Sequence, residues 1–165
     1  MNTNDLRYIK TEKQIRETFL KLVRNGTAPR LVDLCKKAQI NKSTFYDHYE
    51  SMLQLEERIR LDTMRELLTE CPHILDAFSD TESFCRSIIS CFQRKEKTLL
   101  HLYAGNPHVI SAYAEMVLIE LYTKESLGNE VTIRFAIAGA THILTNNLTE
   151  QSIKELIGLI ETLRR

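Results

Sequence analysis

The side chains most suited to chemistry lie in one short stretch of the 165-residue chain, from Lys42 to His48. The side chain of Lys42 suits a guanine edge or a phosphate, and those of Ser43 and Thr44 suit bases or backbone. Tyr46 and His48 suit phosphates, whose contacts fix the register of a protein on DNA without reading sequence. Arg30, at the start of the preceding predicted helix, also suits a phosphate. The candidate nucleic-acid contacts are therefore Arg30, Lys42, Ser43, Thr44, Tyr46 and His48.

Three residues of this stretch also have a plainer interpretation when each is taken singly. Tyr46 would cover the surface of its own domain, His48 would be an ordinary solvated histidine, and Phe45, which precedes them, belongs in the core. Their joint order at a helical spacing favours the functional interpretation.

Helices must position these residues, because apolar side chains recur at three- and four-residue steps and no alternating strand pattern occurs. The first predicted helix covers about residues 8–25, the second 30–38, and the third begins after Asn41 and runs to about Tyr49. Two short helices joined by a tight turn are typical of a helix-turn-helix. Its predicted inner side chains are Leu34, Cys35, Ala38, Ile40, Phe45 and Tyr49.

The rest of the chain predicts a linking helix and a bundle of about five further segments, so the expected fold is all-α with about nine helices. Ser51 is expected to cap the linking helix, which runs to about Thr69, and Ser79 to open the next helix in a capping box with Glu82. The predicted domains are 1–50, with the motif at about 30–49, and a regulatory and dimerisation domain at 51–165. The four cysteines are expected to be free thiols, with redox sensing through Cys85 and Cys91 as the alternative.

The two C-terminal helices combine small and apolar residues, which suits either the core or a self-complementary dimer face. We favour the dimer face, because two apolar helices at the end of so short a chain are costly to leave unpaired. Its predicted residues are Ala136, Gly139, Ala140, Ile143, Ile153, Leu156, Ile157 and Ile160. A second set would line an effector pocket or form plain core: Phe84, Phe92, His101, Tyr103, Tyr113 and Tyr122.

Charge is unevenly distributed although the formal net charge is zero. Residues 1–50 hold ten Lys and Arg against six Asp and Glu, and the remainder has the opposite imbalance. A local excess of positive charge is what phosphate contacts require.

The run from Ala38 to Tyr49 resembles the helix-turn-helix of the TetR family of bacterial regulators, and the resemblance is specific over about residues 9–60. The family pattern reads as alanine, glycine and an aliphatic residue, then Ser-Lys-Gly-Thr-aromatic-Tyr and an aromatic residue or histidine. The resemblance implies a homodimer whose third helices enter the major groove of a palindromic operator. It also implies a small-molecule or protein effector bound in the C-terminal domain, repression as the more frequent outcome, and no cofactor.

Two positions depart from the family pattern. Gln39 replaces the turn glycine, so we expect either a left-handed backbone there or a different turn. Glu50, Ser51 and Met52 stand where the family carries a lysine, which predicts weaker or more salt-sensitive DNA binding unless Lys36 and Lys37 compensate.

Other classes of function find less support in the sequence. An enzyme is not expected, because there is no phosphate-cradling glycine loop, nucleophile elbow or HExxH motif, and the histidines suggest no metal site. No apolar run suggests a membrane span or signal peptide, so a cytoplasmic location is expected. The alternative that stays open is a helical protein-interaction or coregulator module that keeps the helix-turn-helix shape.

Overall fold

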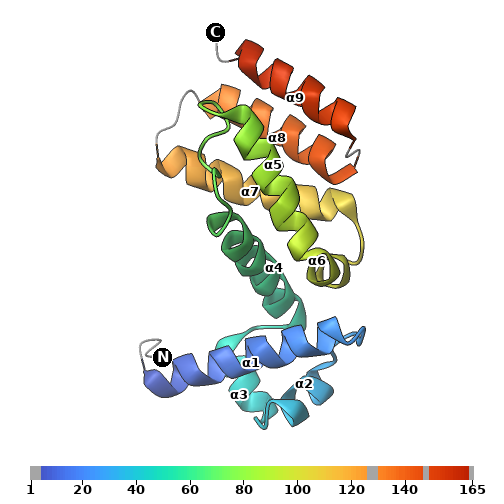
Figure 1. Cartoon of the computed structure of the whole chain (residues 1–165). Coiled ribbons are helices and arrows are strands. Elements are labelled where there is room, and N and C mark those ends of the chain that lie inside the picture. The colour runs from blue at the N-terminus through green and yellow to red at the C-terminus, as the bar shows by residue number, and fades with distance from the viewer. Residues whose placement is uncertain (1–4, 126–129, 147–148, 164–165) are drawn as a thin grey trace. The chain divides into compact units, whose positions relative to one another are not determined.

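The computed structural model describes residues 5–125, 130–146 and 149–163, and its description of side chains leaves out positions 130, 132, 133, 136, 143–146 and 163. Within these ranges the chain forms nine helices and no strand, which confirms the expected all-α class (Figure 1). The chain divides into two compact units, residues 1–60 and 61–165. The division therefore falls inside the linking helix, after the boundary at residue 50 that the sequence predicted.

The first unit begins with helix α1, Leu6–Arg24, whose buried stripe repeats at the predicted three- and four-residue steps. The Asp5 carboxylate caps this helix by accepting a hydrogen bond from the Arg7 N–H at 2.8 Å. At the other end Gly26 takes φ = 70°, a left-handed conformation that glycine adopts without steric cost. The buried side chains of α1 are Ile15, Phe19, Leu22 and Val23.

Two short helices follow, α2 (Leu31–Lys37) and α3 (Lys42–His48), and then the long helix α4 (Met52–Thr69). Ser51 caps α4 as predicted, because its Oγ accepts the Gln54 N–H at 3.1 Å, while the Gln54 side chain accepts the Glu50 N–H at 2.6 Å. These paired hydrogen bonds fix where α4 begins, directly after α3.

The second unit contains α5 (Thr81–Arg94), α6 (Glu96–Leu102), α7 (Pro107–Lys124), α8 (Glu130–Asn146) and α9 (Glu150–Leu163). Helix α8 packs against α7 and α9, and α9 also packs against α5 (Figure 1). The largest fully buried side chains described in this unit include Met64, Leu68, Phe84, Tyr103 and Tyr122.

One local prediction in this unit was wrong. Asp80, rather than Ser79, caps α5, since its carboxylate accepts the Ser83 N–H at 3.1 Å while the Ser79 hydroxyl bonds Asp76. Helices α5 and α6 are separated at Lys95, whose φ of −107° and ψ of 8° lie outside the α-helical range.

The prediction of four free thiols was also wrong for one pair. Cys71, just after α4, and Cys91 on α5 form a disulfide with Cα atoms 6.1 Å apart, whereas Cys35 and Cys85 are free and buried. The two bonded cysteines are 20 positions apart in the chain. Only the packing of α5 beside the end of α4 brings them together.

Candidate nucleic-acid interface

A residue in the left-handed conformation follows the end of α2 and begins the turn to α3. Gln39 has φ = 52°, which is the left-handed alternative expected from the missing glycine. Its N–H donates to the Lys36 carbonyl at 3.3 Å, and the Ile40 N–H donates to the Cys35 carbonyl at 3.0 Å. These two bonds form a Schellman motif, which satisfies carbonyls at the end of α2 and reverses the chain sharply.

Buried side chains hold α2 and α3 against each other and against α1. Five of the six predicted inner residues are buried, and Ile40 is half-buried. Phe45, at the middle of α3, has no exposed surface and therefore fixes the rotation of this helix about its axis. The buried inner residues are Leu34, Cys35, Ala38, Phe45 and Tyr49.

The opposite side of α3 is open to solvent. Lys42 and Ser43 are exposed, 56% of the Tyr46 surface is exposed, and Thr44 is half-buried. Arg30, at the start of α2, is exposed as well. The structure thus places four of the six predicted contact residues in solvent and a fifth partly in solvent.

His48 is placed differently from the other predicted contacts. Its ring is half-buried and stacks on Tyr8 of α1, with ring centroids 3.9 Å apart and an interplanar angle of 24°. Its Nδ1 atom is buried without a hydrogen-bond partner. Burial lowers the pKa of the imidazole, an effect that the carboxylates of Glu12 and Asp47 oppose. The sixth predicted contact therefore faces partly into its own domain.

Helix α1 supplies three residues that the sequence analysis did not single out. Besides Tyr8, Glu12 accepts a hydrogen bond from the Tyr49 hydroxyl at 3.3 Å, and the Gln14 amide donates to the Ala38 carbonyl at 2.6 Å. Burial is the largest cause that raises the pKa of Tyr49, and the nearby charge of Glu12 raises it further. Helical spacing contained a signal for Tyr8, because it lies seven residues before the buried Ile15 and hence on the same face of α1.

The predicted dimer residues of the second unit divide into two groups. Ala140, Ile153, Leu156 and Ile160 are buried inside a single chain, whereas Gly139 is exposed and Ile157 is half-buried. The side chains of Ala136 and Ile143 lie outside the described residues.

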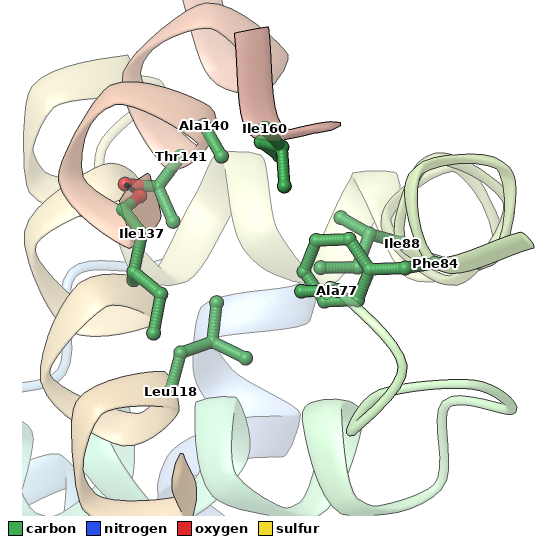
Figure 2. A pocket seen from close by; sticks show the side chains of 8 residues that line it. All are labelled: Ala77, Phe84, Ile88, Leu118, Ile137, Ala140, Thr141 and Ile160. Carbon is green, nitrogen blue, oxygen red and sulfur yellow. Dashed lines mark hydrogen bonds between the residues drawn. The ribbon is translucent and has the colours of Figure 1, made fainter. Parts of the chain in front are cut away.

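The six residues predicted to line an effector pocket lie in different surroundings. Phe84 borders a cavity of about 10 Å³, barely enough for one water, together with apolar side chains of α5, α7, α8 and α9 (Figure 2). Tyr103 is buried edge-on against the half-buried Tyr113. The Tyr122 hydroxyl accepts the Ala77 N–H and donates to the Ile74 carbonyl, each at 2.9 Å, as a core tyrosine does. Of the other two, Phe92 is half-buried and His101 is exposed.

Comparisons with protein-family models, with curated proteins and with solved structures found no match to this chain. Among the described helices, none combines the length and apolarity that crossing a bilayer requires. No three His, Cys, Asp or Glu side chains gather as a metal site in the described part of the chain.

Proposed function

We propose that this chain is a TetR-like transcription regulator that binds operator DNA as a homodimer, with α3 in the major groove. The observation that carries the proposal is the two-sided character of α3. Phe45 is completely buried, while Lys42, Ser43 and Tyr46 on the same helix are exposed. A recognition helix needs this combination, because buried side chains hold the helix in place while its exposed polar side chains contact base edges.

Exposed lysines supply the charge that DNA binding needs near α3. Lys36 and Lys37 in the last turn of α2 and Lys42 at the start of α3 are all exposed, whereas α4 begins beside the acidic Glu50. We infer that the phosphate contacts come from α2 and α3 and not from α4. Six or so such contacts would make the affinity fall by about three orders of magnitude between 50 and 200 mM salt.

The homodimer in this proposal is supported by exposed apolar and small residues on α8. Val131 and Phe135 are 74% and 63% exposed, and Gly139 follows one helical turn later on the same stripe. A Cβ atom at Gly139 would meet nothing within 4 Å, so packing inside one chain does not require glycine there. Close approach of a partner helix would explain both the exposed Phe135 and a glycine that costs helix stability.

Repression in the cytoplasm of a bacterial cell is the outcome that the family resemblance supports. A dimer that occupies two half-sites of an operator excludes other proteins from the same stretch of DNA.

A salt-dependent binding titration against DNA that flanks the protein's own gene tests the proposal. We expect specific binding that weakens steeply with salt, and at least a tenfold loss of affinity in a Lys42→Ala/Tyr46→Ala variant. Lys42→Ala alone should reduce the slope of log K against log salt by about one. The exposed Lys124→Ala, in the second unit, is the matched control and should bind as the parent does. A flat salt response, or equal affinity for random DNA, would contradict the proposal.

The coregulator alternative rests on exposed apolar side chains in the first unit. Leu6 and Ile9 on α1, Val32 on α2 and Leu53 on α4 are between 49% and 82% exposed. Such side chains suit a protein partner better than a phosphate backbone. A dimeric Lys42→Ala/Tyr46→Ala protein that binds DNA as tightly as the parent would favour this alternative.

A further inference from the structure

Asp47 is an exposed residue of α3 that the predicted DNA contacts do not include. At about 100° per residue, Ser43 lies about 160° and Asp47 about 200° around the helix axis from the buried Phe45. On the same count Lys42 and Tyr46 lie only about 60° and 100° from Phe45, so they flank the exposed side. Ser43 and Asp47 therefore form the centre of the exposed side of α3.

An acidic side chain at this position suits neither the end of the helix nor a phosphate. Asp47 is the last residue but one of α3, where a negative charge opposes the helix dipole. Its carboxylate makes no hydrogen bond or ion pair within the described part of the chain. On DNA it would repel the phosphates that the neighbouring lysines attract. The edge of a base is the remaining group that this carboxylate suits.

The base edges in the major groove determine which base a carboxylate favours. An ionised carboxylate only accepts hydrogen bonds. Guanine presents two acceptors, thymine presents an acceptor and a methyl group, and adenine presents an acceptor beside its donor. Cytosine presents the N4 amino group, which is a donor, and no acceptor of its own. A carboxylate at the centre of the exposed side of α3 therefore favours cytosine over the other three bases.

We propose that Asp47 determines specificity for one cytosine in each half-site of the operator, by accepting a hydrogen bond from the cytosine N4 amino group. This role rests on the proposed function, because it requires α3 to lie in the major groove. The repulsion between Asp47 and phosphates adds to the discrimination, because it weakens binding wherever the cytosine contact is missing.

Selection of binding sites by the full chain, from a pool of duplex DNA with a randomised segment, tests this role. We expect the parent to enrich cytosine at one fixed position of each half-site. Asp47→Ala should lose the preference at that position and keep it at the others. Asp47→Asn should shift it towards adenine, whose N6 and N7 atoms an amide contacts together.

A binding titration on the selected operator measures the size of the effect. Replacing the cytosine, with its paired guanine, should weaken binding by the parent at least about fivefold, and binding by Asp47→Ala less than about twofold. Asp33→Ala is the matched control, because it removes the same charge from an exposed position in the first turn of α2. It should keep the cytosine preference, whereas a general gain in affinity from the lost charge should appear in both alanine variants.

Two results would overturn the role of Asp47 while DNA binding stands. In one, Asp47→Ala selects the same sequences as the parent. In the other, the preference that it loses is for adenine, guanine or thymine. A parent that enriches no sequence at all would instead contradict the proposed function, and the role of Asp47 with it.

Discussion

Gln39 occupies a backbone conformation that side chains with a Cβ atom adopt at a cost. Its φ of 52° is required by the Schellman turn that joins α2 to α3, and the cost is about 1–2 kcal/mol for a residue other than glycine. Besides its local hydrogen bonds, this turn has a tertiary contact, the hydrogen bond from the Gln14 amide to the Ala38 carbonyl.

Replacing Gln39 by glycine should raise the free energy of unfolding by about 0.5–1 kcal/mol, because the strain at φ = 52° exceeds the added backbone entropy of glycine. Urea denaturation followed by circular dichroism measures this change. Gln39→Ala keeps the Cβ atom and should bring no gain. An equal gain in the alanine variant would show that the side chain, and not the backbone, is the source of the cost.

His48 makes the stability of the first unit depend on pH. Burial lowers the folded-state pKa below the ordinary value of 6.5, so the unfolded chain binds the proton more readily. The stabilisation from a neutral His48 is therefore complete above about pH 6.5 and is lost progressively below it, as the pH falls through the lowered folded-state pKa.

We expect the parent to lose more stability than a His48→Gln variant between pH 7.5 and pH 5.5, values that lie about one unit either side of the ordinary histidine pKa. Urea denaturation at the two pH values measures the difference, and His101→Gln, at an exposed histidine, serves as the control. A His48→Gln variant with the same pH dependence of stability as the parent would show that His48 is not its source.

At the scale of elements, the disulfide joins the segment after α4 to α5. Cys71 and Cys91 are both buried, with 4% and 1% of their surfaces exposed, and they close a loop of 20 positions that contains the start of α5. Closing such a loop restricts the unfolded chain, which stabilises the folded state.

Reduction should lower the free energy of unfolding of the parent by about 3 kcal/mol. The comparison is made by urea denaturation with and without a thiol reductant. In a Cys71→Ala/Cys91→Ala variant the reductant should have no effect, because Cys35 and Cys85 are free thiols in either case. An unchanged free energy of unfolding of the parent in the presence of the reductant would contradict a stabilising disulfide.

At the scale of the whole molecule, the proposed assembly depends on the exposed stripe of α8. Phe135→Asp places a charge at a 63% exposed apolar position and should weaken dimerisation at least about 30-fold, as loss of a hot-spot aromatic does. Size-exclusion chromatography with light scattering at several concentrations measures the shift to monomer. Leu100→Asp, at a 46% exposed position on α6, should remain dimeric. Equal behaviour of the two variants would contradict a dimer through α8.

Much of the fold could be predicted because its signals are local. The stripe from Ile15 to Val23 depends on helical period, and the cap at Ser51 depends on hydrogen bonds within one turn. The predicted cap at Ser79 was wrong because the adjacent Asp80 has a similar capping preference and caps α5 instead.

The sequence by itself determined the all-α class and the two-sided pattern of the 42–48 segment, because hydrophobic period is a property of the chain. Only the tertiary structure decided which surface covers each apolar side chain. It buried Ala140 and Leu156 inside one chain, paired Cys71 with Cys91, and laid Tyr8 across His48. These contacts join residues distant in sequence, and they depend on how whole helices pack, which no local pattern encodes.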